Sequence, residues 1–411
     1  MKQFLAVTFA LCSLALAGEG SVYSRYGIGE IHLASRGKNI AMGSVGVGMF
    51  GETFINFANP AGLAGITRTL VNAGYQYRNY NSEDASGTSV VGTGNISEFG
   101  LAIPIYLPKK IVLSLGVLPF SSVGYQQEAT QQVGSDSANI IQQFEGRGGL
   151  NSAQLSLSYS ATSDITVGLT AHYLFGAIYQ DHSIHFSSSE FFGGSYNQTL
   201  SLSGFGLTLG GLYAGIDKAL GISTNGNVNL GAAFFSGSSL DFDDEILRNF
   251  SSNQDTMAAN NKTMSLPFGF SFGLSYSRNK VIYAADFDFQ NWDTYKVNGI
   301  KPTEIQNSVR AGAGIEFLPS DNFVESFWDR ISYRVGGYYR ITNTKVNGTS
   351  IDEMFASGGI GLPLSFDSRL NIGLEYGIRG TTSSSLIKDT IIRFTVSLTA
   401  SELMFIPPPI D

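Results

Sequence analysis

The feature that most constrains the fold of this chain is an alternation of apolar and polar residues that recurs along most of its length. In residues 371–379, the apolar side chains of Ile372, Leu374, Tyr376 and Ile378 alternate with polar or small ones. The same pattern recurs in residues 283–292, 330–340 and 392–398. A β-strand points successive side chains to opposite faces, so each segment would have one apolar and one polar face. The pattern predicts an all-β protein.

Fourteen such segments can be counted, and most are ten or more residues long. This length matches a tilted strand that crosses a bilayer and exceeds that of most strands in soluble proteins. An even number of strands is typical of bacterial outer-membrane barrels. We therefore predict a 14-stranded antiparallel transmembrane β-barrel over residues 67–401. A β-sandwich or a propeller is less favoured, because the strands are long and no 40-residue repeat is present. The segments lie near residues 67–80, 95–106, 110–125, 150–161, 163–179, 197–216, 226–238, 263–277, 280–293, 304–317, 329–342, 350–364, 368–380 and 389–400.

The connections between these segments alternate in length, which predicts the orientation of the barrel. Outer-membrane barrels have short periplasmic turns and long external loops. The connection at 318–328 is longer than this rule predicts for a turn. The short turns are expected at 107–109, 161–162, 277–279 and 365–367, and the long polar loops at 81–94, 126–149, 180–196 and 239–262.

The composition agrees with a membrane-embedded barrel and argues against a nucleic-acid partner. Charged residues make up 14% of the chain, against roughly 25% in soluble domains. The chain contains 49 Gly, 29 Phe and 19 Tyr, and no run of eighteen apolar residues that would form a transmembrane helix. The net charge of -8 would repel phosphates. The expected surroundings are the lipid bilayer and lipopolysaccharide of a Gram-negative outer membrane.

Residues 1–17 have the pattern of a secretory signal peptide. Lys2 precedes a short apolar run, and Ala15-Leu16-Ala17 is an A-x-A cleavage site. An uncleaved anchor helix is the less favoured alternative, because the apolar run ends directly after this site. Cys12 is the sole cysteine and is expected to leave with the signal, so the mature chain would have no thiol chemistry. Residues 402–411 are expected to form a periplasmic C-terminal tail.

Residues 18–66 precede the first strand, do not alternate and are rich in small and apolar side chains. A free tail would be more polar. The lumen of a barrel of this size is too wide for its own side chains to fill. We therefore predict that residues 18–66 fold inside the lumen as a plug. The glycines of residues 43–48 are expected to allow close backbone packing there, because the βαβ context of a dinucleotide site is lacking.

Several short motifs resemble those of the FadL/TodX family of outer-membrane transporters of long-chain fatty acids and hydrocarbons. The first, in the predicted plug, is Asn59-Pro60-Ala61-Gly62, and the second is Pro119-Phe120 in the third strand, where Ser121 replaces the family's glycine. Residues 266–269, 285–287 and 291–293 are similar to a later stretch of that family, and residues 24–29 and 402–405 resemble its Bacteroidetes-type branch. That branch includes members with no established substrate.

The resemblance implies passive uptake of a hydrophobic, fatty acid-like ligand, which would enter a plugged barrel and leave sideways into the membrane. In the family, this exit lies beside a kinked third strand, so Pro119 and Phe120 are the expected kink. Proline lacks the N–H that a strand ladder needs, which makes an interruption at Pro119 plausible on physical grounds as well. The simpler reading, in which Pro119 ends a strand at the rim, is equally favoured.

The polar faces of the strands carry charges of both signs that are expected to point into the lumen. One reading is that an arginine there binds a ligand carboxylate. The favoured reading is that the charges pair with one another and hold the plug, and we expect Arg334 and Arg340 to contact it. The candidates for ligand or plug contacts are Arg334, Arg340, Arg379, Asp286 and Asp288.

We expect neither an enzyme nor a cofactor or metal site. His182 and His185 lack a third ligand at a diagnostic spacing for zinc, and the acidic residues 241–245 lack a calcium-loop pattern. The leading functional prediction is a channel for hydrophobic compounds. The alternative is a non-transporting barrel that serves as a subunit or scaffold of an outer-membrane secretion or assembly complex, with other outer-membrane or periplasmic proteins as partners. A breach in the wall would favour the channel, and a sealed wall with a filled lumen would favour the scaffold.

Overall fold

A computed structural model describes residues 20–133, 138–187, 191–216, 221, 226–250, 253–320, 326–364 and 368–402. The predicted signal peptide, with Cys12, and nearly all of the predicted C-terminal tail lie outside these residues. Among the described residues, no helix is long and apolar enough to cross a membrane.

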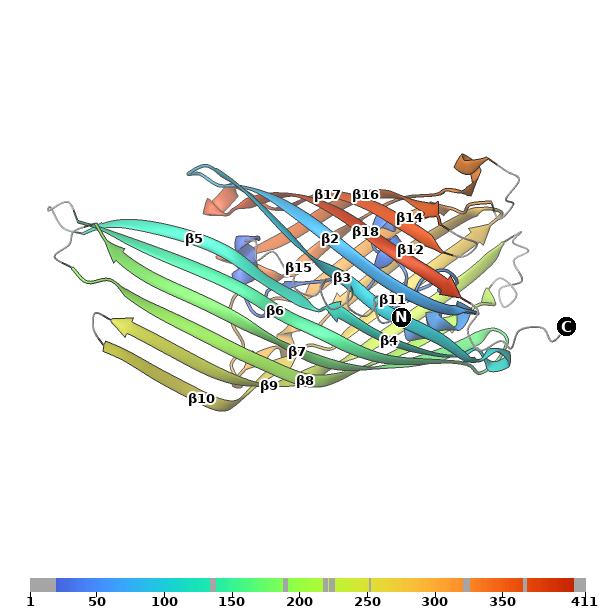
Figure 1. Ribbon diagram of the computed structural model, residues 1–411, viewed down its shortest axis with the longest axis horizontal. Coiled ribbons are helices and arrows are strands. Elements are labelled where there is room, and N and C mark those ends of the chain that lie inside the picture. The colour runs from blue at the N-terminus through green and yellow to red at the C-terminus, as the bar shows by residue number, and fades with distance from the viewer. Residues whose placement is uncertain are drawn as a thin grey trace, which may run out of the picture.

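The described residues form a closed antiparallel β-barrel whose first and last wall strands, β2 and β18, pair along their whole lengths (Figure 1). The two-residue periodicity of the sequence produces this arrangement, because it gives every strand one face for lipid and one for the lumen. The strands are β2 (Thr69–Glu83), β3 (Thr88–Tyr106), β4 (Ile111–Pro119), β5 (Ser121–Val133), β6 (Ala138–Ser160), β7 (Ile165–Phe186), β8 (Gly194–Tyr213), β9 (Asn227–Phe250), β10 (Asn253–Leu266), β11 (Gly269–Arg278), β12 (Val281–Gln290), β14 (Ser308–Phe317), β15 (Ser332–Val346), β16 (Thr349–Pro363), β17 (Arg369–Gly380) and β18 (Lys388–Glu402).

The barrel has fourteen strands, as the sequence predicts, because two of its wall positions are each occupied by two consecutive strands. β4 and β5 both pair with β6 and are separated at Phe120. β10 and β11 both pair with β9 and are separated at Pro267 and Phe268. Each interruption includes or directly follows a proline, whose missing N–H cannot continue the ladder.

The outer surface of the barrel carries a belt of exposed apolar side chains. On β6, Leu155 and Leu157 are 49% and 46% exposed, and on β7, Val167 and Leu169 are each 45% exposed. The alternating lumen-side neighbours, such as Ser156 and Ser158, are buried. An apolar band around a closed barrel is stable when lipid covers it. The chain is therefore an integral β-barrel of the outer membrane.

Residues 20–66, here called the N-terminal segment, lie within the ring of strands, as the blue ribbon in Figure 1 shows. They form three short 3₁₀ helices and one two-residue strand, and most of their side chains are buried. Helix η3 packs against β14 to β18, and η4 packs against β4, β6, β7 and β8. These elements are η2 (Val22–Arg25), β1 (Glu30–Ile31), η3 (Gly37–Met42) and η4 (Pro60–Gly65).

Four predicted external loops are wrong, because most of their residues continue the barrel strands. Residues 81–94 extend β2 and β3, and residues 126–149, 180–196 and 239–262 extend β5 to β10. As a result, β5 to β10 project much farther than β14 to β18 at one end of the barrel (Figure 1). The opposite end carries the short turns and the end of β18, which identifies it as the periplasmic end.

The remaining short elements lie in the connections. At the periplasmic end, η5 joins β3 to β4 and η7 precedes β15. At the external end, η6 and β13 follow β12, and η8 precedes β18. Their bounds are η5 (Leu107–Lys109), η6 (Trp292–Thr294), β13 (Lys296–Val297), η7 (Phe327–Arg330) and η8 (Ser383–Ser385).

Candidate functional site

The interruption between β4 and β5 is occupied by the N-terminal segment. β3 pairs with β4 but not with β5. The hydrogen bonding between neighbouring wall strands is therefore interrupted on the external side of Pro119. β1 instead pairs antiparallel with the first two residues of β5. The backbone N–H of Gly20 donates to the carbonyl of Gly124 (2.8 Å), and that of His32 donates to the carbonyl of Phe120 (3.0 Å). The segment thus supplies backbone partners that β3 does not supply.

Pro119 and Phe120, the predicted kink, lie at this interruption. The Phe120 N–H still bonds to the carbonyl of Leu150 on β6 (2.8 Å), whereas its carbonyl turns to the N-terminal segment. The guanidinium of Arg36 donates to the carbonyl of Pro119 (3.1 Å) and is 8% exposed. The strand is therefore interrupted where the sequence suggests, but the N-terminal segment lies against the interrupted edge. A lateral exit for a ligand stays a prediction.

A largely buried carboxylate, Glu30, anchors the segment beside this interruption. Its oxygens accept hydrogen bonds from Arg379 on β17 (2.8 and 3.1 Å), from Arg393 on β18 (3.2 Å) and from the Tyr80 hydroxyl on β2 (3.0 Å). Arg379 also binds Glu353 on β16 (2.8 Å). Burial raises the pKa of Glu30, but the guanidinium groups of Arg379 and Arg393 outweigh this effect and hold the pKa well below its ordinary value. Glu30 is therefore ionised at neutral pH.

His32 adds a neutral contact next to this ion network. The Arg78 guanidinium lies 3.1 Å from His32 Nδ1, and because arginine can only donate, the ring nitrogen must accept. Burial and the charges of Arg78 and Arg36 hold the pKa of His32 well below its ordinary value. His32 is thus a hydrogen-bond acceptor rather than a cation.

The predicted lumen arginines Arg334 and Arg340 reach the segment in different ways. Arg340 donates directly to the Ile31 carbonyl (3.0 Å). Arg334 binds Glu316 (2.9 Å), and Glu316 in turn binds Lys38 of the segment (2.7 Å), with all three side chains buried. Both arginines thus use their donors on protein groups. Their role as ligand contacts stays a prediction.

Asp286 and Asp288, on neighbouring lumen-facing positions of β12, hold another part of the segment. One oxygen of Asp286 accepts the backbone N–H groups of Gly46 (2.7 Å) and Val47 (3.1 Å). Asp288 binds Arg310 on β14 (2.6 Å). A second Arg310 nitrogen donates to the carbonyl of Gly43, in the glycine-rich residues 43–48 of the segment (3.0 Å). The charges on this side of the lumen therefore also bind the N-terminal segment.

The glycine-rich run of the segment touches the barrel wall by backbone contact. A Cβ added at Gly231 of β9 would lie 2.0 Å from the Val47 carbonyl oxygen. A Cβ added at Gly273 of β11 would lie 2.3 Å from the Gly48 nitrogen. Side chains at these two wall positions would displace the segment, since no real Cβ approaches backbone atoms so closely.

The predicted motif Asn59-Pro60-Ala61-Gly62 forms the start of η4. Asn59 caps the helix by accepting the Ala61 N–H (3.1 Å), and Pro60 occupies the first turn, where its missing N–H has no cost. The Asn59 amide also donates to carbonyls of Val47 (2.8 Å) and of Gly211 on β8 (3.0 Å). The motif therefore folds the segment and fastens it to the wall.

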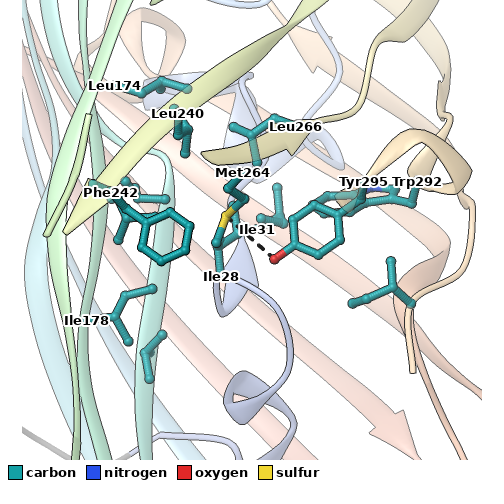
Figure 2. Packing of buried hydrophobic residues seen from close by; sticks show 14 of the residues in the cluster. Ile28, Ile31, Leu174, Ile178, Leu240, Phe242, Met264, Leu266, Trp292 and Tyr295 are labelled. Carbon is teal, nitrogen blue, oxygen red and sulfur yellow. Dashed lines mark hydrogen bonds between the residues drawn. The ribbon is translucent and has the colours of Figure 1, made fainter. Parts of the chain in front are cut away.

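Above the segment, the lumen is filled by apolar side chains from the tall strands β5 to β10 and from the connection after β12 (Figure 2). Ile28 and Ile31 of the segment lie near the middle of the cluster, between Phe242 on one side and Trp292 and Tyr295 on the other. Tyr295 donates to the Met264 sulfur at 3.6 Å. The buried residues of this cluster are at most 7% exposed, so the cluster fills the upper lumen by direct packing.

A cavity of about 160 Å³ remains between the segment and the wall. It reaches the interruption beside Pro119 and extends across the lumen to β14. Its lining is mixed, with apolar contributions from Leu118, Phe120 and Phe235 and polar ones from His172, Asp288 and Arg310. An engineered apolar cavity of about 150 Å³ holds benzene, so the volume suits one small ring rather than an extended acyl chain.

The other titratable clusters are part of strands rather than of binding loops. His182 and His185 lie on β7, where His182 stacks on Phe144 at 4.2 Å. In the acidic stretch of β9, Asp244 binds Lys262 (2.6 Å). The ranges that the structure describes contain no group of three or more His, Cys, Asp or Glu side chains able to hold a metal ion.

His172 has the environment of a satisfied core histidine. It bonds to the hydroxyls of Ser152 (3.2 Å) and Thr208 (2.7 Å). Neither partner is a carboxylate, which a nucleophilic triad uses to orient the ring.

Glu30, Glu353 and Lys38 are the residues that sequence reasoning missed. Glu30 follows the glycine-rich residues 27–29 in a stretch without periodicity, so no pattern places it in the lumen. Glu353 occupies a lumen position of β16 by alternation. The adjacent Asp352 is also charged, so the sequence does not show which of the two faces the lumen. Lys38 lies in a short 3₁₀ helix whose six residues are all buried.

Comparison with known protein families gives one match that spans nearly the whole sequence. A family model described as BamG matches residues 1–407. This is a different family from FadL/TodX, which the motifs of the sequence resemble. No protein with a curated description matches the chain.

Comparison with solved structures identifies the same type of barrel. The "CymD monoaromatic hydrocarbon channel" aligns with a TM-score of 0.61 and 14% identity over 91% of this chain and 99% of that chain. The P. putida toluene transporter TodX aligns with a TM-score of 0.60 and 14% identity over 90% and 100%. A Pseudomonas aeruginosa FadL homologue aligns with a TM-score of 0.59 and 14% identity over 90% and 98%. At this identity, the likeness establishes the FadL-type fold.

Proposed function

This chain belongs to the BamG family, and from that premise we propose that it is a non-transporting barrel subunit of an outer-membrane assembly complex. The observation that carries the proposal is the closure of the interrupted wall by the N-terminal segment. Backbone pairing with β5, the Glu30 ion network and the packed upper lumen all support a closed barrel. The likeness to hydrocarbon channels rests on the fold, which is shared by proteins of different function.

The cost of opening this barrel supports the proposal. A ligand passing beside Phe120 would have to separate β1 from β5, and a movement of β1 would also take Glu30 away from Arg379 and Arg393. Breaking a buried ion pair by removing one partner costs roughly 3–5 kcal/mol. In a subunit that transports nothing, the same interactions have a simple purpose, which is to keep the barrel rigid and watertight.

We predict that the full chain, purified from its native outer membrane in a mild detergent, is recovered with one or more other outer-membrane proteins in fixed stoichiometry. Native mass spectrometry would measure the ratio. A transporter barrel with the same tag, expressed at the same level in the same membrane, controls for nonspecific recovery. Recovery of the chain alone, with an apolar compound in its lumen, would contradict the proposal.

A specific observation favours a second candidate function, a channel for small hydrophobic compounds. The cavity of about 160 Å³ reaches the interruption at Pro119 and is large enough for one aromatic ring. Ala233 lines this cavity, so Ala233→Trp would fill it. Toluene entry into liposomes that exceeds entry into protein-free liposomes, and that disappears with Ala233→Trp, would support the channel. The subunit proposal predicts no excess entry with either protein.

A further inference from the structure

The tall strands β5 to β10 form a sheet that rises beyond the membrane. On β6, the outward apolar residues end at Ala153, and the next outward residue, Asn151, is polar and exposed. β6 then continues to Ala138. β5 pairs with residues 138–148 of β6 and thus lies wholly beyond the apolar belt. Because the short turns mark the periplasmic end, this sheet is external.

The outer edge of β5 has backbone groups that its neighbours in the barrel do not use. Both backbone groups of Gly124 point to this edge, because its N–H bonds to Ser24 and its carbonyl to Gly20. By the two-residue alternation of a strand, the backbone groups of Glu128, Thr130 and Gln132 point the same way. Across the ranges that the structure describes, no backbone hydrogen bond reaches these three residues from that side.

This edge also lacks proline, lysine and bulges, three features that proteins use to prevent strand addition. From Gly124 to Val133, β5 contains no proline and no lysine, and its register with β6 is continuous. The opposite edge of the same sheet, β10, carries Lys262 next to a register shift that begins after Ala259. Lysine and bulges blunt a strand edge, whereas a regular edge with a single carboxylate, Glu128, can still be a template for another strand.

We propose that the outer edge of β5, from Glu128 to Gln132, binds an extended segment of a partner protein by β-strand addition. This inference rests on the proposed subunit function and names the surface that the partner uses. The chain already shows the mode of binding, because β1 adds to the first two residues of the same edge. The exposed Glu128 side chain favours a polar or basic residue in the partner strand.

Amide hydrogen exchange tests the edge directly in the native complex. Strand addition should protect the amides of Glu128, Thr130 and Gln132 by roughly tenfold or more relative to the isolated chain in detergent. The amides of Ala129 and Gln131, which already face β6, should change little. Equal exchange of the alternate amides in the complex and in the isolated chain would overturn the inference.

A matched pair of substitutions at Thr130 separates the backbone from the side chain. Thr130→Pro removes the outward N–H but leaves the bonds of Ala129 and Gln131 to β6, and Thr130→Ala keeps the N–H. We expect Thr130→Pro to lower the recovered partner by roughly tenfold or more and Thr130→Ala to leave it unchanged. Heat-dependent migration on a denaturing gel shows that both variants fold as barrels.

The outcomes distinguish failure of this inference from failure of the subunit function. If Thr130→Pro recovers the partner in the same ratio as the wild-type chain, strand addition at the edge of β5 is disproved, but the subunit function is not. The absence of any partner with the wild-type chain overturns both. A complex whose mass equals two copies of this chain overturns the assignment to a different protein.

Discussion

Glu30→Ala should release the N-terminal segment from the wall of the barrel. The substitution leaves Arg379 with Glu353 alone and Arg393 with weaker partners, and it removes the acceptor of the Tyr80 hydroxyl. Loss of one member of a buried ion network costs about 3 kcal/mol, which corresponds to roughly a hundredfold increase in the released population. Trypsin cleavage after Arg36, which is buried in the closed barrel, would measure this population in proteoliposomes.

The matched control is Glu52→Ala, which removes an exposed carboxylate from the same segment. Its cleavage rate after Arg36 should stay close to that of the wild-type chain. If Glu30→Ala is also cleaved at the wild-type rate, the ion network does not hold the segment, and the closure of the interruption must be explained by packing.

Gly231→Val should destabilise the barrel by driving the segment away from β9. The added side chain begins 2.0 Å from the Val47 carbonyl oxygen, and moving the Val47 backbone away would strain its N–H bond to Asp286. Overpacking of this kind costs up to about 3 kcal/mol. Denaturant unfolding in detergent micelles, followed by the loss of the heat-resistant folded band, would measure the change.

Gly211→Val makes the same substitution on the neighbouring strand, but at a position facing outward with no atom near its Cβ. Valine has a higher β-strand propensity than glycine, so this variant should be as stable as the wild-type chain or slightly more stable. Equal stability of Gly231→Val and Gly211→Val would show that the Val47 contact does not constrain the fold.

The alternation of apolar and polar residues predicts the barrel because it is present wherever one face of a strand contacts lipid and the other faces the lumen. In β17, Leu374 and Tyr376 are more than half exposed, and the intervening Glu375 is buried, as the sequence pattern indicates. The pattern weakens beyond the membrane, where water contacts both faces. Residues 126–132 are mostly polar and therefore look like a loop, although their ladder with β6 is continuous. Strand pairing, rather than side-chain pattern, decides the structure there.

The interruptions of the wall were only partly predictable. Pro119 signals the break between β4 and β5. Pro267 is an equal signal for the break between β10 and β11, although the alternation predicts one strand over residues 263–277. Neither proline reveals what covers the interrupted edge. The partner of β5 is β1, about ninety positions earlier in the chain, and such distant pairings leave no trace in a single sequence.

The motifs point to the fold more than to the function. Asn59 and Pro60 resemble a FadL/TodX element, and the structure gives them a folding role, since they start η4 and fasten it to β8. A lumenal segment in a barrel of this type needs such a fastening whether or not the barrel transports a ligand. The resemblance therefore agrees with the FadL-type fold, whereas the family match is to BamG.

Depletion of this chain in its native host, with two quantities measured together, tests the proposed subunit function. The two quantities are the amounts of other outer-membrane barrel proteins and the rate of long-chain fatty acid uptake per cell. The subunit function predicts that the amounts of other barrels fall, because a subunit of their assembly complex is missing. It also predicts that fatty acid uptake falls no further than the amounts of these barrels do. A loss of uptake with unchanged amounts of the other barrels would contradict it and identify the chain as a channel.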